Sequence, residues 1–151
     1  MNYEIATLKE KTVVGKSIRT TNENGQSMQD IGKMWQDFLG QGYYDIIANQ
    51  ATGKGIGLYT EYDSDASKPY TFMCCLEVSN EDGTELETRR IRAGKYAKFT
   101  IKGNPMEAVG KAWQAIWSMD LDRKFSDDFE VYHNDSEDME NQTIDIYVSV
   151  I

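Results

Sequence analysis

Two helix-like segments that lie far apart in the chain share one sequence pattern, and this pattern constrains the fold more than any other feature. Residues 31–38 read IGKMWQDF and residues 109–116 read VGKAWQAI, so Gly, Lys, Trp and Gln recur in place between apolar ends. The expected order of elements around both segments is also the same, namely one strand, the helix, an irregular stretch and two strands. A chance match between two amphipathic helices is the alternative, and it leaves this shared order unexplained.

Start and stop signals accompany both predicted helices. The first helix is expected to begin at Ser27, which with Asp30 three residues on resembles a capping box, and to end at Gly40. The second is expected to begin with Asn104 as its cap and Pro105 at its first position. One stripe of each helix is apolar. The stripes consist of Met28, Ile31, Trp35 and Phe38, with Met34 beside them, and of Val109, Trp113 and Ile116, with Trp117 adjoining.

Alternating β-forming residues predict the strands. They cover residues 3–8, 11–20, 56–62, 70–78, 86–91, 94–101, a strand at 129–132, and 144–150. We expect residues 41–55 to be irregular, and Asp82 with Gly83 to form a turn. The run ATGKGIG (51–57) superficially looks like a phosphate loop, but it lacks the Ser or Thr after the Lys and the correct glycine spacing. We therefore interpret it as an ordinary loop.

These elements predict an α+β fold. It consists of a duplicated β-α-β-β unit with pseudo-twofold symmetry, in which helices pack on antiparallel sheets. We expect a single domain over 1–151, with pseudo-repeats of approximately 1–80 and 86–151. Units of this size bury only one face of a small sheet against one helix, so each needs the other. Their pairing is expected to leave a central groove, where ligand sites tend to form.

The strand FEVY (129–132) carries the most informative side chain. Strand alternation places Glu130 and Tyr132 on one face. In the repeat, Tyr59 corresponds to Tyr132, and Gly57 corresponds to Glu130. One half thus supplies a charge where the other leaves space, as expected of a pocket with a single charged anchor. The alternative is that this carboxylate lies on a solvent-exposed face of the strand.

The composition narrows the classes of function. There are 25 acidic and 16 basic residues and a net charge of −9, and such a surface repels phosphate backbones, so we expect no direct contact with nucleic acid. The chain shows no signal peptide and no apolar run that could cross a bilayer, so a cytoplasmic protein without membrane contact fits best. Adjacent Cys74 and Cys75 would point to opposite faces of a strand and make a poor disulfide or metal site. We expect no metal and no cofactor.

Three segments, together with the duplicated unit, carry a resemblance to a known family. The segments are YTFMCCLEV (70–78), AGKYAKFTIKG (93–103), and DFEVYHND (128–135) followed by IDIYVSV (144–150). They resemble GyrI-like small-molecule-binding domains, also known as the effector-binding domains of AraC-type and MerR-type multidrug regulators, which include stand-alone integron-encoded proteins. The likeness covers nearly the whole chain. Its most specific part is the Glu-x-Tyr strand followed by the Asp-Ile-Tyr strand.

The resemblance implies an aromatic-lined pocket between the halves, with a glutamate that meets cationic lipophilic compounds. That glutamate maps onto Glu130. The aromatic candidates by position are Trp35, Tyr59, Trp113, Tyr132 and Tyr147. Aromatic residues at helical spacing usually belong to the core, so Trp35 and Trp113 are expected to pack there and could also form pocket walls. The chain shows no helix-turn-helix segment, so a regulatory role would need a DNA-binding partner protein.

Three kinds of function remain open. We favour binding of a cationic, aromatic small molecule. The second is catalysis, since the resemblance includes hydrolases of cyclopropane-containing alkylating toxins, in which Glu130 with Tyr132 would carry the reaction. The sequence offers no Ser–His–Asp set, and His133 fits a loop better than a catalyst, so binding is favoured over catalysis. The third is a protein-interaction adaptor that uses the groove or an edge strand.

Overall fold

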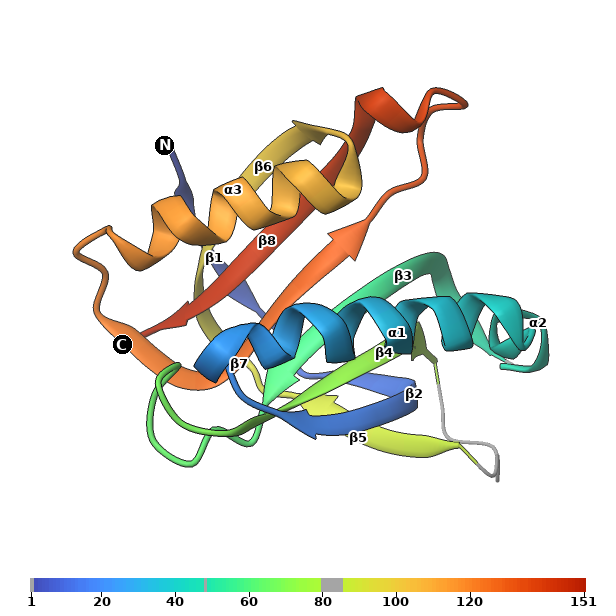
Figure 1. Ribbon diagram of the computed structural model, residues 1–151, viewed down its shortest axis with the longest axis horizontal. Coiled ribbons are helices and arrows are strands. Elements are labelled where there is room, and N and C mark those ends of the chain that lie inside the picture. The colour runs from blue at the N-terminus through green and yellow to red at the C-terminus, as the bar shows by residue number, and fades with distance from the viewer. Residues whose placement is uncertain (1, 48, 80–85) are drawn as a thin grey trace.

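One antiparallel sheet organises the structure, a computed structural model that describes residues 2–47, 49–79 and 86–151 (Figure 1). Within these residues the sheet has eight strands in the order β1-β6-β8-β7-β3-β4-β2-β5. The strands are β1 (Glu4–Leu8), β2 (Lys11–Thr20), β3 (Gln50–Thr60), β4 (Tyr70–Val78), β5 (Glu87–Ile91), β6 (Gly94–Gly103), β7 (Arg123–Tyr132) and β8 (Gln142–Val150). The predicted α+β class is confirmed. The expectation of separate sheets is wrong, because β3 and β7 pair directly and join both halves into one sheet.

Two long helices, α1 (Gln26–Gly40) and α3 (Pro105–Trp117), cover the same face of this sheet (Figure 1). Phe38 of α1 packs in one buried cluster with Val14 and Phe72, and Ile116 of α3 packs in another with Phe99. Strand register places these sheet residues on one face. The shorter helical elements are η1 (Glu23–Gly25), α2 (Tyr43–Ile46) and η2 (Met139–Asn141). Among the described residues, no helix has the length and apolar character needed to span a membrane.

The opposite face of the sheet has its own buried cluster, which includes Leu58, Met73 and Phe129. The sheet is curled, because Leu8 of β1 and Ile91 of β5 come from opposite edges and pack against this same cluster. Burial of apolar surface on both faces stabilises the fold. The two faces therefore form separate environments.

Strands β3 and β7 form the middle of the sheet. On one side the order continues to β4 and β2, and on the other to β8 and β6. Gly57 of β3 lies directly opposite Glu130 of β7, and Leu58 lies opposite Phe129. The residues that the sequence singled out thus lie at the centre of the molecule.

The two helix starts differ from each other. Asn104 caps α3 as predicted, since its side chain accepts hydrogen bonds from the backbone N–H groups of Met106 (3.1 Å) and Glu107 (3.4 Å). The predicted capping box at Ser27 is wrong. Helix α1 begins at Gln26, after Gly25 in the left-handed region with φ 70°, and without a side-chain cap. The preceding η1 turn leads directly into the helix through a conformation that favours glycine.

Two polar stretches contain more structure than predicted. Residues 41–55 include α2 and the first part of β3, which begins at Gln50 with a register shift between Gln50 and Gly55. Strand β7 begins at Arg123, ahead of the predicted strand, and its pairing is irregular between Arg123 and Asp128. Such irregularities interrupt the alternation by which strands are recognised. The turn predicted at Asp82 and Gly83 lies outside the described residues.

Candidate functional site

Glu130 is a buried carboxylate held by three aromatic donors. Its side chain projects from β7 toward the helices, and the residue is 1% exposed. The hydroxyl of Tyr59 donates to Oε1 at 2.6 Å, and the indole Nε1–H of Trp113 donates to the same oxygen at 2.7 Å. The hydroxyl of Tyr132 donates to Oε2 at 2.5 Å. These bonds fix both carboxylate oxygens.

Gly57 provides the space for this arrangement. A Cβ atom at position 57 would lie 3.0 Å from Glu130 Oε2 and 3.2 Å from Phe72 Cε1. Both distances are shorter than ordinary van der Waals contact, so a side chain at this position would compete with the carboxylate. The central strand pair therefore combines a charged residue with a partner that has no side chain.

The three side chains that donate to the Glu130 carboxylate are uncharged. Within the described part of the chain, no Lys, Arg or His side chain forms an ion pair with it. Burial raises the pKa of the Glu130 carboxyl, because desolvation disfavours the charged form, while the hydrogen bonds from Tyr132, Tyr59 and Trp113 lower that pKa in part. Burial, reinforced by the nearby carboxylate, also raises the pKa values of Tyr59 and Tyr132 well above the ordinary tyrosine range. Both tyrosines thus stay neutral donors.

The neighbouring buried acids are paired differently. Asp128 accepts from Arg123 Nη2 at 2.7 Å and from the Tyr62 hydroxyl at 2.6 Å. Asp127 lies 3.4 Å from Arg92 Nη1 and accepts from Thr60 Oγ1 at 2.6 Å. Each aspartate thus has an arginine, as expected of buried structural carboxylates. Glu130 differs from both because its donors are all uncharged.

Aromatic rings surround the carboxylate. The ring of Tyr59 lies 5.1 Å from that of Phe72 and 5.3 Å from that of Trp113, measured between centroids. The ring of Trp35 lies 5.3 Å from that of Tyr132 in an edge-to-face arrangement. Trp113 is buried, whereas Trp35, Tyr59 and Tyr132 are half-buried. We call Glu130 with Trp35, Tyr59, Phe72, Trp113 and Tyr132 the Glu130 cluster.

The two tryptophans come from the two covering helices. Trp35 of α1 packs on the buried cluster that contains Phe38 and Phe72, and Trp113 of α3 belongs to the cluster on the other half. The prediction that both pack in the core is confirmed. Trp113 also donates a hydrogen bond to the carboxylate, and its role as a pocket wall stays a prediction.

The structure brings five of the six predicted site residues together and leaves Tyr147 apart. Tyr147 lies on the opposite face of the sheet, where its ring stacks on that of Phe129 with centroids 4.6 Å apart. The register explains this, because Ile146 of β8 pairs with Glu130 and the next residue points the other way. Phe72 was missed as a member of the cluster, and its sequence context does not distinguish it from any other buried strand residue.

Metal ligands are not grouped in the described part of the chain, where no set of three or more His, Cys, Asp or Glu side chains could hold an ion. Cys74 and Cys75 are free and buried, and burial raises the pKa of both thiols far above the usual cysteine range. Neither thiol is therefore a ready nucleophile.

The chain as a whole is similar to known proteins. Over residues 4–150 the chain matches the family described as "Integron-associated effector binding protein" (Cass2). A Bacillus subtilis (strain 168) protein named "Putative transcriptional regulator protein YobU" is 27% identical in an alignment of 147 residues, which covers 93% of this chain and 92% of that protein.

Two solved structures share the fold. An integron cassette protein from the mobile metagenome of Vibrio cholerae matches with a TM-score of 0.78 and 24% identity, over 99% of this chain and 95% of that one. SAV2435, solved bound to tetraphenylphosphonium, matches with a TM-score of 0.84 and 21% identity, over 100% of this chain and 94% of that one. The match to the family over residues 4–150 confirms the resemblance carried by the strand segments, and these two structures agree with it in fold.

Proposed function

Because the chain belongs to the family of integron-associated effector binding proteins, we propose that it binds small lipophilic cations and that Glu130 is their anchor. The observation that carries this proposal is the buried carboxylate of Glu130, which has three uncharged donors and no ion-pair partner among the described residues. The similar fold of SAV2435, solved with tetraphenylphosphonium, supports the choice of a lipophilic cation as ligand.

The energetics favour a cationic guest. Burying a charged carboxylate costs roughly several kcal/mol of desolvation free energy, even after its surroundings relax. The three neutral donors offset part of this cost, and a cation beside the carboxylate would offset more. Each ring placed face-on to the cation would add about 0.5–2 kcal/mol of cation–π attraction. A neutral ligand of the same shape would gain only the apolar contact.

Access to Glu130 requires side chains to move, because the residue is 1% exposed. Trp35, Tyr59 and Tyr132 are the half-buried members of the cluster, so we expect them to swing aside and form the pocket walls. Displacing a tyrosine hydroxyl from the carboxylate frees an acceptor oxygen for the ligand charge. The predicted groove would thus open with the ligand.

The two halves of the chain would share the ligand. We propose that residues 1–151 form one domain built from two related halves, approximately 1–80 and 86–151. The matching helix segments 31–38 and 109–116 and the strand order on either side of β3 and β7 support this proposal. A ligand at Glu130 would touch both halves, through Trp35 of α1 and Trp113 of α3.

A regulatory use of this site would act through another protein. Ligand binding would change the positions of α1 and α3, and a DNA-binding partner protein could read that change. The net charge of −9 makes direct contact between this chain and nucleic acid unfavourable. Drug sensing by such a pair of proteins is the role that we propose.

Hydrolysis of cyclopropane-containing electrophiles gains no support from the geometry. Three aromatic donors occupy three of the roughly four acceptor sites of the Glu130 carboxylate, so the geometry holds a charge in place and does not single out a site for activating water. His133, the one histidine, follows β7 on the opposite face and bonds to Asp145. We therefore propose binding rather than catalysis.

Titration with tetraphenylphosphonium tests the proposal. Calorimetry of the wild-type chain should show saturable binding, and Glu130→Gln should weaken it by about tenfold or more, since this change removes the charge while keeping the shape. The matched control is Glu137→Gln, which removes the same charge from an exposed residue and should leave the affinity unchanged.

A neutral probe separates charge from shape. Triphenylphosphine oxide presents similar aromatic surface without the positive charge, so we expect it to bind wild type and Glu130→Gln with similarly low affinity. Equal affinity of wild type and Glu130→Gln for tetraphenylphosphonium would remove Glu130 from the site.

A further inference from the structure

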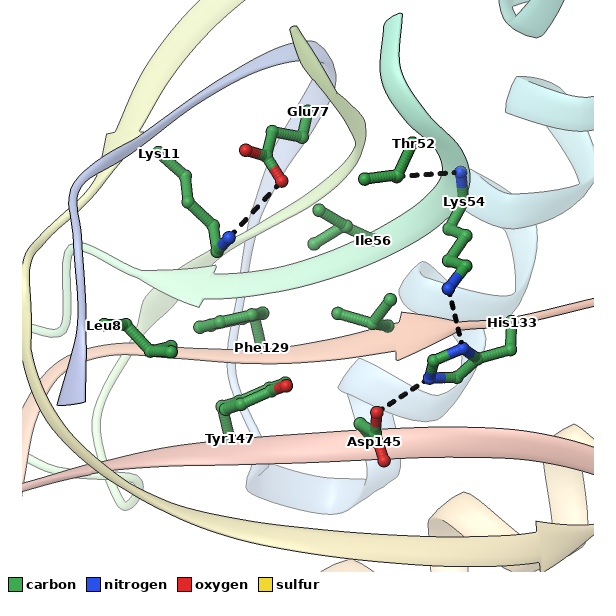
Figure 2. A pocket seen from close by; sticks show the side chains of 11 residues that line it. Leu8, Lys11, Thr52, Lys54, Ile56, Glu77, Phe129, His133, Asp145 and Tyr147 are labelled. Carbon is green, nitrogen blue, oxygen red and sulfur yellow. Dashed lines mark hydrogen bonds and ion pairs between the residues drawn. The ribbon is translucent and has the colours of Figure 1, made fainter. Parts of the chain in front are cut away.

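A cavity lies on the face of the sheet that the helices do not cover. It has a volume of about 170 Å³, and its lining includes Lys54, Phe129, His133 and Tyr147 (Figure 2). Strand alternation separates it from the Glu130 cluster, because Phe129 and Glu130 are consecutive residues of β7 and point to opposite faces. The sheet itself therefore forms a wall between the two sites.

The carboxylates that line this cavity are already paired. Glu77 Oε1 lies 3.4 Å from the ammonium of Lys11. Asp145 accepts from Thr100 Oγ1 at 2.6 Å and contacts His133 Nε2 at 2.7 Å, and Lys98 Nζ lies 4.0 Å from it. Neither acid needs a ligand to compensate its charge.

The ammonium of Lys54 differs from these paired charges. In the part of the chain that the structure describes, Lys54 forms no ion pair with a carboxylate, and its ammonium contacts only His133 Nδ1, at 3.0 Å. Figure 2 shows Lys54, His133 and Asp145 following one another along one wall of the cavity. Among the charged side chains that line the cavity, Lys54 is thus the one for which the described residues provide no oppositely charged group within 4.0 Å.

The hydrogen-bond chain fixes the role of His133. An ammonium only donates hydrogen bonds, so His133 Nδ1 must accept from Lys54, and Nε2–H must then donate to Asp145. Asp145 orients the imidazole, and the imidazole holds the lysine. The lysine keeps its remaining N–H donors for a ligand.

Apolar side chains form a continuous part of the cavity lining. Ile56 and Phe129 are buried in its floor, Leu8 lies at its side, and the ring of Tyr147 stacks on Phe129. A dry cavity of roughly 150 Å³ can hold a benzene ring. The size and lining therefore fit a ligand with one ring or a short branched chain.

From this combination we propose that the cavity binds a small monocarboxylate with an apolar body, its carboxylate on Lys54 and its body on Phe129. Lys11 lies on the same cavity and supplies a second positive charge when the ligand draws it away from Glu77. The site is independent of the proposed cation site, since it uses other side chains on the other face of the sheet.

Benzoate is the probe for this proposal. Chemical shifts of the ¹⁵N-labelled chain, followed during titration, should show saturable binding of benzoate, with changes centred on Lys54, Phe129 and His133. Neither benzamide nor benzylammonium should compete, because neither carries the negative charge. The indole N–H signal of Trp113 should stay in place with benzoate and move with tetraphenylphosphonium, which distinguishes the two sites.

Two lysine variants complete the test. Lys54→Met keeps the apolar stem and should lower benzoate affinity by about tenfold or more, whereas Lys111→Met on the exposed side of α3 should have no effect. Lys11→Met should give a smaller loss in the same direction and serves if Lys54→Met misfolds. Absence of benzoate binding to the wild-type chain, or equal binding by Lys54→Met, would overturn the proposal. Loss of tetraphenylphosphonium binding in Glu130→Gln bears only on the other site.

Discussion

Gly57 and Glu130 face each other across the central strand pair, and they show how one missing side chain makes room for a buried charge. The backbone of Gly57 pairs with that of Glu130, and Phe72 closes the third side. At the residue scale, the site depends on this space as much as on the carboxylate. Any side chain at position 57 would have to displace the carboxylate or the Phe72 ring.

Gly57→Ala tests this dependence. The added Cβ would lie 3.0 Å from Glu130 Oε2, so we expect a loss of about 1–3 kcal/mol in the free energy of unfolding from overpacking, together with weaker cation binding. Urea denaturation followed by tryptophan fluorescence measures the first effect, and calorimetric titration measures the second.

Gly32→Ala is the matched control within α1. A Cβ at position 32 meets no atom within 4 Å, so this change should instead stabilise the helix by about 0.5–1 kcal/mol. If both variants shifted the unfolding free energy in the same direction, the close contact at Gly57 would not be the cause.

Sequence alternation predicted the immediate neighbours of Glu130 but not every member of its surroundings. Tyr132 shares a strand with Glu130, and the repeat aligned Tyr59 with Tyr132, so both predictions relied on local spacing. Tyr147 lies outside the Glu130 cluster. The face of the sheet on which its side chain lies depends on the register between β7 and β8, which no local pattern encodes. The roles of these residues in ligand binding stay predictions.

At the scale of single elements, the sequence predicted a helix start that depends on a side chain and missed one that depends on backbone conformation. The start of α3 was predicted from Asn104, whose side-chain oxygen caps the helix. The start of α1 was predicted incorrectly, because this helix follows Gly25 in a left-handed backbone conformation and has no side-chain cap. The first part of β3 was missed because its residues are exposed and polar, which removes the alternation.

The cap of α3 is open to direct test. Asn104→Ala should lower the free energy of unfolding by about 1 kcal/mol, because two backbone N–H groups at the start of α3 would lose their acceptor. Asn104→Ser keeps a capping oxygen and should retain most of the stability. Thermal unfolding of the three proteins side by side gives the comparison, and equal losses in both variants would contradict a capping role.

At the scale of the whole molecule, one curled sheet separates two chemically different faces. Among the described residues, the helix-covered face holds a buried carboxylate without a basic partner, and the other face holds a lysine without an acidic partner. The sequence predicted the α+β class and the order of elements, because these follow from periodicity. It did not predict a single sheet, because the pairing of β3 with β7 brings together strands far apart in the chain.

The sign of the pH dependence follows from the raised pKa of Glu130. Burial raises this pKa in the ligand-free protein, and a cation bound beside the carboxylate would lower it again, since it favours the charged form. Binding and deprotonation are therefore linked. Affinity for a cation should be low below the raised pKa, rise as pH increases through it, and become constant above it.

The affinity for tetraphenylphosphonium across this pH range, in wild type and in Glu130→Gln, tests the central claim most directly. We predict that wild-type affinity rises by about tenfold per pH unit at pH values below the Glu130 pKa and then levels off. Glu130→Gln should bind weakly, with no such rise. Parallel pH profiles with equal affinities in the two proteins would contradict the assignment of Glu130 as the cation anchor.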